Sequence, residues 1–200
     1  MDEGVFDLNQ FLIAKHIMTP AEKIEIFNEK SKLKDALKYL KSNNFDIAVV
    51  EMNSKSYGYI MREDIEYNRT KGGIRKHIKN ISPEGKIPSN LPLEEVIKKF
   101  EKHHYLFIFD EDMFKGIITY ADLNKTPIYV LLYSIISVFE VTMREIVKKR
   151  YENEREWLEK LSDKSQREIG GIFISEKAKG VETSLLECTT LTQLKEILEK

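Results

Sequence analysis

The chain has 200 residues, of which 42% are hydrophobic and 32% are charged. Its 32 basic and 33 acidic side chains nearly cancel, so the formal net charge of −1 gives no electrostatic reason to expect nucleic acid or an anionic membrane as the main partner. The single cysteine, Cys188, excludes an intramolecular disulfide and a cysteine-based metal site.

No export signal or membrane segment is predicted. The chain begins Met1-Asp2-Glu3, which lacks the basic and then apolar pattern of a signal peptide. The longest apolar run, at 128–139, is too short for the roughly 20 residues that a membrane-spanning helix needs. We therefore expect a soluble, cytoplasmic protein with no membrane partner.

A helical pattern occurs twice along the chain. Apolar residues at 33, 36, 37 and 40 have the i, i+3, i+4, i+7 spacing of an amphipathic helix, and the same spacing returns at 93, 96, 97 and 100. Ser31 is the predicted N-cap of the first helix, and Pro92 stands near the first turn of the second. The tripeptide Lys-His-Ile also recurs, at 15–17 and 76–78. These recurrences indicate an internal duplication.

Each of these helices is followed by a predicted hairpin. Strand-like runs at 45–50 and 105–109 lead through polar turns into second strands that open with glycine. Each half therefore has the order strand, helix, hairpin, helix. The two halves cover residues 13–70 and 74–125, and a polar, glycine-containing stretch joins them.

Two motifs connect the repeats with a known family. Ile17-Met18-Thr19-Pro20 is similar to the segment that opens the first of two paired CBS domains. The stretch Gly116-Ile117-Ile118-Thr119-Tyr120-Ala121-Asp122 is similar to the family signature of Gly, two apolar residues, Thr or Ser, any two residues, and Asp. Over residues 13–125 the chain thus resembles a CBS domain pair, or Bateman module, of prokaryotic type, with an archaeal or thermophilic source among the alternatives. The resemblance implies an α+β or α/β fold of tandem β-α-β-β-α repeats, followed by an all-helical extension at 126–200.

The resemblance also implies a function. Such pairs pack through their sheets, commonly dimerise, and bind adenosine-containing ligands in the clefts between repeats. We therefore expect a regulatory, ligand-sensing protein and no enzyme, with AMP, ADP, ATP or S-adenosylmethionine as the ligand and an unidentified protein target. A homodimer formed through the paired domains and the long C-terminal helix is expected, and nucleic acid is not an expected partner.

The signature of the second repeat contains groups suited to a nucleotide. The Asp122 carboxylate can accept hydrogen bonds from both hydroxyls of a ribose, and the Thr119 hydroxyl can donate to a phosphate oxygen near a helix N-terminus. Gly116 permits close backbone approach or a bulge. Thr19, in the opening motif, is also assigned to the ligand site. The alternative is that Thr119 and Asp122 only cap the following helix, because both residue types are good N-caps.

An apolar slot for the adenine follows from the resemblance. The resemblance places it between the segment that opens the second repeat and the hairpin that follows. The residues assigned to this slot are Ile78, Asn80, Ile81, Tyr105 and Phe107.

The first repeat departs from the signature. At the position of the hydroxyl residue it has Met61, followed by Arg62 and Asp64. Asp64 is a candidate ribose ligand, and Arg62 a candidate phosphate contact in place of the missing hydroxyl. Equally, Met61 can fill an apolar gap while Arg62 remains a solvated charge. We expect two unequal clefts, with binding mainly in the second repeat.

No metal site, cofactor or catalytic motif is predicted. The four histidines, His16, His77, His103 and His104, do not form HxH or HExxH patterns. A P-loop, a G-x-G-x-x-G motif and a G-x-S-x-G motif are also absent from the sequence.

The C-terminal region reads as helices. Thr126-Pro127 is a predicted helix start, with the helix running to about 160. Ser162 is a predicted cap of a second helix, which is interrupted or ended near Gly170-Gly171, and a further segment closes at Gly180. Residues 190–193 form a predicted capping box for the last helix.

Two other functions remain open. The helical tail has a distant similarity to the HEPN ribonuclease-type fold, but the Arg-then-His motif of those nucleases is missing because no histidine follows residue 104. An atypical nuclease under CBS control would have to use Arg144, Glu145, Arg155 and Asp163. The remaining alternative is a structural oligomerisation module with empty clefts.

Overall fold

The computed structural model describes residues 12–53, 56–68 and 73–199. The chain forms two compact units, which divide between Leu131 and Leu132. The first unit contains both repeats and the start of the long helix. The second contains the rest of that helix and the C-terminal helices.

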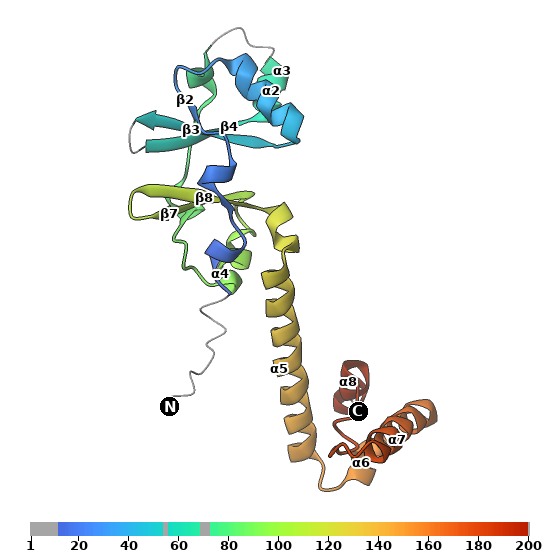
Figure 1. Ribbon diagram of the computed structural model, residues 1–200. Helices are drawn as coiled ribbons and strands as arrows, with labels where there is room; N and C mark the ends of the chain where they lie inside the picture. Colours follow the sequence, from blue (N-terminus) through green and yellow to red (C-terminus); the bar gives the residue numbers. More distant parts are fainter. Residues whose placement is uncertain (1–11, 54–55, 69–72, 200) are drawn as a thin grey trace. The chain divides into compact units, whose positions relative to one another are not determined.

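The first unit is built on two four-stranded sheets (Figure 1). The first sheet has the order β2-β3-β4-β5 and the second the order β1-β8-β7-β6. The strands of the first sheet are β2 (Phe27–Asn28), β3 (Ile47–Asn53), β4 (Ser56–Met61) and β5 (Lys79–Asn80). Those of the second are β1 (Thr19–Pro20), β6 (Lys86–Ile87), β7 (Tyr105–Asp110) and β8 (Met113–Thr119).

The opening strands of the two repeats are exchanged between the sheets. β1 comes from the first repeat but pairs antiparallel with β8, with Thr19 opposite Ile117. β5 comes from the second repeat but pairs antiparallel with β4, with Lys79 opposite Tyr59. Each sheet is therefore completed by a strand from the other repeat, a connection that the repeat pattern alone did not predict.

Glycine makes each of these crossings sterically feasible. A Cβ on Gly116 would lie 2.4 Å from the backbone oxygen of Thr19, and one on Gly58 would lie 2.7 Å from the backbone oxygen of Lys79. The glycine expected to permit close backbone approach does so at both hairpins, and what it approaches is the opening strand of the other repeat.

Helices cover the outer faces of the sheets in the first unit (Figure 1). They are α2 (Leu33–Asn43), α3 (Arg62–Asn68) and α4 (Leu93–Lys99). Short 3-10 turns at Ala14–His16, Ala21–Lys23, Ile74–His77, Pro83–Gly85 and Tyr120–Asn124 connect the elements, and Ala21 packs into the layer between the sheets. The predicted cap at Ser31 is wrong, because Lys32 is the N-cap of α2 and the Ser31 hydroxyl accepts from the Asn28 amide in the preceding turn. Pro92 is the N-cap of α4.

The central strands are buried on both faces, which explains their nearly continuous apolar runs. Along β3, Ile47 and Val49 face the other sheet, whereas Ala48 and Val50 face α2 and α3. β7 alternates in the same way between the inter-sheet core and the core beneath α4. The inter-sheet layer is the place where the two repeats meet.

The second unit consists of the C-terminal part of α5 (Thr126–Arg150) with α6 (Glu154–Leu158), α7 (Asp163–Ala178) and α8 (Leu191–Glu199). The predicted single helix to 160 is wrong, because α5 ends at Arg150 and α6 begins four residues later. The Asn153 side chain caps α6 by accepting from the Glu156 amide. A separate core of α5 to α8 side chains contains Met143, Val147, Trp157, Leu161, Ile169, Leu186, Cys188, Leu194 and Ile197.

Two predicted helix starts and one predicted helix end in this unit are confirmed. The Ser162 hydroxyl accepts from the Ser165 amide at the start of α7. The Thr190 amide donates to the Gln193 side chain, and the Gln193 amide donates to the Thr190 hydroxyl, which is the predicted capping box. Gly180, at φ +78°, stands just beyond the end of α7. The predicted interruption near 170–171 is wrong, since α7 continues through both glycines.

Candidate ligand-binding cavity

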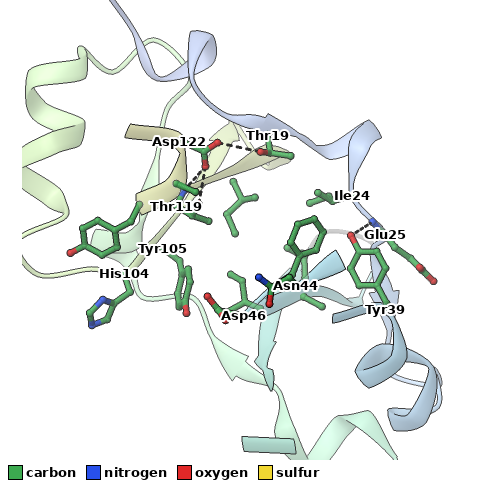
Figure 2. Close-up of a pocket in the computed structure, with 17 residues that line it drawn as sticks. Thr19, Ile24, Glu25, Tyr39, Asn44, Asp46, His104, Tyr105, Thr119 and Asp122 are labelled. Atoms are coloured by element: carbon green, nitrogen blue, oxygen red, sulfur yellow. Dashed lines mark hydrogen bonds between the residues drawn. The ribbon is translucent and has the colours of Figure 1, made fainter. Parts of the chain in front are cut away.

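A cavity of about 510 Å³ lies in the first unit and is lined by residues from both repeats. This volume falls within the range of roughly 300–1,000 Å³ that is typical of small-molecule sites. Figure 2 shows Thr19, Thr119 and Asp122 on one side of the cavity, and Tyr39, Asn44 and Asp46 across from them. The exchange of the opening strand brings Thr19 of the first repeat beside the signature of the second.

Asp122 is the most buried charged residue of this wall, with 6% of its surface exposed. Its Oδ2 accepts from the Thr119 amide at 2.7 Å and from the Thr119 hydroxyl at 3.0 Å. These bonds cap the 3-10 turn that follows β8, as the capping alternative predicted. The same carboxylate lines the cavity, so capping and exposure to a ligand coexist at this residue.

The other oxygen of Asp122 is held by a cation. Lys125 Nζ lies 2.7 Å from Asp122 Oδ1 and donates to the backbone oxygen of Ile17 at 2.6 Å. The Thr19 hydroxyl is 3.5 Å from the same Oδ1, a long and weak hydrogen bond. The carboxylate thus links the signature of the second repeat to the opening segment of the first.

The opposite wall is formed by the end of α2 and the start of β3. Asn44 adopts a left-handed conformation at φ 52° after α2, which turns the chain directly into β3. The Arg62 guanidinium donates to Asn44 Oδ1 at 3.1 Å and to Asp46 Oδ1 at 3.0 Å. Arg62 is therefore neither a free solvated charge nor a member of the cavity wall, but it fixes two residues that are.

Tyr105 lines the cavity, and its surroundings shift the pKa of its hydroxyl. Burial raises the pKa of Tyr105 above its usual value near 10, and the negative charge of Asp46 raises it further. The phenol therefore stays protonated through neutral pH and presents a hydrogen-bond donor. Its neighbour His104 also lines the cavity and packs against Tyr120 with ring centroids 5.9 Å apart.

A second, smaller cavity of about 240 Å³ holds most of the predicted adenine slot. Asn80, Ile81 and Phe107 line it together with Met61, and Tyr105 lines both cavities. The predicted site residues are thus divided: Asp122, Thr119 and Thr19 share the large cavity, whereas the residues assigned to the adenine slot belong mainly to the small one. The strand exchange is the reason, because β5 pairs with the first repeat's hairpin.

Four predicted ligand residues line neither cavity: Arg62, described above, and Asp64, Gly116 and Ile78. Asp64 forms an ion pair with Lys79 at 2.7 Å, and this hydrogen bond raises the pKa of Lys79 above its usual value. Gly116 is buried beneath Pro20, and Ile78 packs against the core under α2 and α3. Lys79 pairs with β4 at the position that corresponds to Thr19 on β8. The first repeat therefore has a lysine beside Asp64 where the second has a threonine beside Asp122.

Apart from Thr19, sequence reasoning missed the first repeat's contribution to the large cavity. Tyr39, Asn44 and Asp46 are part of the wall, although they lie far in sequence from the signature. Tyr39 accepts a hydrogen bond from the Glu25 amide at 3.1 Å and packs edge-on against Phe45. The packing of the two repeats against each other was the missing information.

Three of the four tail residues considered for catalysis have local partners. Arg144 donates to the backbone oxygens of Leu186 at 3.3 Å and Thr189 at 3.0 Å. Glu145 pairs with Lys148, and Arg155 with Glu159. Within the described residues, no group of three or more His, Cys, Asp or Glu side chains is arranged to hold a metal ion.

Residues 78–128 match the family model of the CBS domain. A CBS domain-containing protein of unknown function from Bacillus anthracis is 17% identical over 57% of this chain and 91% of its own, with a TM-score of 0.50. CBSX2, solved in complex with AMP, is 15% identical over 59% and 97%, also at 0.50. CbpB, solved in complex with c-di-AMP, is 24% identical over 64% and 93%, at 0.49. A search of curated proteins found no match.

These similarities confirm the predicted fold of CBS-type repeats followed by helices. The family match includes Thr119, Asp122 and the start of α5. At the identities found, the similarity to the solved structures concerns the fold alone.

Proposed function

We propose that this chain, in which residues 78–128 match the CBS domain, is a ligand-sensing regulatory protein that binds an adenosine-containing small molecule in the large cavity. The observation that carries the proposal is Asp122, a nearly buried carboxylate in the wall of a mostly apolar cavity between two repeats. The AMP bound by CBSX2, a protein with the same fold, supports an adenosine-type ligand.

The cavity offers separate surfaces for the parts of such a ligand. Apolar side chains, among them Ile24, Ile47 and Ile117, suit a purine ring. Asp122 Oδ1 suits a ribose hydroxyl, because a carboxylate accepts strong charge-assisted hydrogen bonds. Of its two present partners at that oxygen, Thr19 is weakly held at 3.5 Å and is the easier one to replace.

A ligand at this position has a direct connection to the tail. A ribose hydroxyl on Asp122 Oδ1 competes with Lys125, which also holds the backbone oxygen of Ile17. Lys125 is the residue immediately before α5. Binding would thus alter the residue from which the long helix starts, and regulation follows if the ligand prefers one of two arrangements there.

The first test is a calorimetric titration of the full chain with AMP, ADP, ATP and S-adenosylmethionine. We expect at least one to bind, and the melting temperature to rise with its concentration. A ligand at 100 times its Kd stabilises the folded state by about 2.7 kcal/mol. Absence of heat from all four, with melting curves that coincide, would instead support a structural module with an empty cavity.

Asp122→Asn tests the site itself. Loss of a charged acceptor costs about 1.5–3 kcal/mol, so we expect affinity to fall by roughly 10- to 150-fold. Asp64→Asn is the matched control, because Asp64 is the corresponding residue of the first repeat and lies outside the cavity wall. Equal affinity in both variants would place the ligand elsewhere. Thr19→Val, which leaves the capping bonds intact, separates a binding effect from a folding effect.

A further inference from the structure

The charged side chains in the wall of the large cavity are acidic. Glu25, Asp46 and Asp122 line it, whereas neither a lysine nor an arginine does so among the residues that the structure describes. Adenine nucleotides carry several negative charges, and proteins ordinarily hold phosphates with arginine or lysine. The cavity that suits an adenosine therefore lacks, in its wall, the side chains that best hold the phosphates of a nucleotide.

Two cations adjoin the wall, and each is already paired with a carboxylate. Arg62 donates to Asp46 Oδ1 at 3.0 Å. Lys125 lies 2.7 Å from Asp122 Oδ1 and donates to the backbone oxygen of Ile17 at 2.6 Å. Each of these pairs has a summed charge of zero, and displacement of Lys125 from Oδ1 by a ribose hydroxyl does not change that sum. The carboxylate of Glu25 therefore leaves the wall with a negative charge.

The donors of Thr119 are engaged within the protein. Its amide and its hydroxyl both donate to Asp122 Oδ2, at 2.7 and 3.0 Å, and these bonds cap the turn at Tyr120–Asn124. A hydroxyl has only one proton to donate. A phosphate that took the Thr119 hydroxyl would thus compete with the cap of this turn.

Aromatic rings contribute to the same wall. Tyr39, Phe45, Tyr105 and Tyr120 line the cavity, and Figure 2 shows Tyr39 and Tyr105 on opposite sides of it. Phe45 and Tyr120 keep 39% and 49% of their surface exposed, so their rings remain available for contact. The face of a tyrosine or phenylalanine ring attracts a cation through its quadrupole. Rings and carboxylates together favour a positively charged ligand.

We infer that the large cavity selects adenosine compounds with a positive charge at the 5′ side of the ribose and discriminates against 5′-phosphates. The inference rests on the proposed function and specifies the chemical class of its ligand. S-Adenosylmethionine belongs to this class, because its sulfonium is bonded directly to C5′. With the ribose held on Asp122, the sulfonium occupies the space in which AMP would place its phosphate.

The test is a calorimetric titration of the full chain with S-adenosylmethionine, S-adenosylhomocysteine and AMP. S-Adenosylhomocysteine lacks only the methyl group and the positive charge of the sulfonium. We expect S-adenosylmethionine to bind at least about tenfold more tightly than AMP, with S-adenosylhomocysteine between them. An increase in NaCl from about 50 to about 500 mM should weaken S-adenosylmethionine by at least about twofold more than S-adenosylhomocysteine, because salt screens a charge but not a methyl contact.

Glu25→Gln tests the contribution of the wall's charge. Glu25 is exposed, so the variant should keep the wild-type melting temperature. We expect its affinity for S-adenosylmethionine to fall by about threefold and its affinity for AMP to rise. Glu22→Gln is the matched control, because Glu22 is an exposed glutamate on the turn at Ala21–Lys23 and lies outside the cavity wall. It should bind both compounds as the wild type does.

The outcomes separate this inference from the proposed function on which it rests. AMP that binds as tightly as S-adenosylmethionine, or more tightly, overturns the charge selection and leaves the proposed function in place. The same conclusion follows if salt affects S-adenosylmethionine and S-adenosylhomocysteine equally, or if Glu25→Gln and Glu22→Gln behave alike. Failure of all these compounds, and of ADP and ATP, to bind overturns the proposed function and this inference with it.

Discussion

Backbone proximity, more than ligand chemistry, accounts for the glycine of the signature. Gly116 faces Pro20 across the exchanged strand pair, and its position leaves no room for a methyl group. Gly58 has the same relation to Asn80. Gly116, which helps to identify the motif in the sequence, therefore acts by letting β1 pair closely with β8 beside the cavity.

Gly116→Ala should destabilise the first unit. A Cβ there would lie 2.4 Å from the Thr19 oxygen and 3.1 Å from the Pro20 Cα, so backbone must move. Overpacking of this kind costs about 1–3 kcal/mol, and we expect a lower midpoint in chemical denaturation. Gly170→Ala is the opposite case, because nothing lies within 4 Å of a Cβ in the middle of α7. It should stabilise by up to about 1 kcal/mol. A stable Gly116→Ala protein would contradict the steric account.

At this scale the sequence predicted part of the wall of the large cavity. Thr119 and Asp122 were found because their spacing is local and both stand at one turn. Asn44 and Asp46 were not found, because their place in the wall depends on how the two repeats pack against each other, which no local pattern encodes. Their only local signal is the left-handed conformation that Asn44 tolerates after a helix.

Among the elements, helix starts were predicted better than helix ends. The caps at Ser162 and Thr190 depend on side chains within three residues, which a sequence displays. The end of α5 at Arg150 depends instead on packing, since Val147 and Trp157 share the core of the second unit and the chain must turn between them. The charged residues around the break are equally compatible with a continuing helix.

Arg144 should be a principal contributor to the second unit. Its guanidinium donates to two backbone oxygens in the loop before α8, and only 19% of the side chain is exposed. Arg144→Met leaves those carbonyls without their charged donor, so we expect a loss of about 1.5–3 kcal/mol in denaturant unfolding. Arg155→Met, at 87% exposed and paired only with Glu159, should change stability by less than about 1 kcal/mol. Equal effects would show that the Arg144 bonds contribute nothing specific.

For the whole molecule, the proposed signal must pass from the cavity to α5. The connection consists of Asp122, Lys125 and the first turn of the helix, whose Ile128 amide donates to the Lys125 oxygen. The cores of the two units share no residue, so α5 is the covalent element common to both.

Saturation with the ligand found by calorimetry should therefore alter amide hydrogen exchange at residues 126–131. We expect a change in exchange rate of at least about twofold there, because opening of the first turn depends on what holds Lys125. Peptides from α7 serve as the internal reference. Binding that leaves the first turn of α5 unchanged would show recognition without transmission by this route.

The exchange of opening strands has a consequence for the order in which the protein is made. Thr19 and Pro20 leave the ribosome early, but their partners Ile117 and Gly116 emerge almost 100 residues later. At roughly 5–20 residues per second, this strand waits several seconds or longer without its partner. The sheet that contains β3 can form completely once β5 has been synthesised. The other sheet must pair β8 with β1, a strand that was synthesised before any strand of the β3 sheet. Nascent chains that are arrested before β8 should therefore contain the complete β3 sheet, while β1 lacks its pairing partner β8.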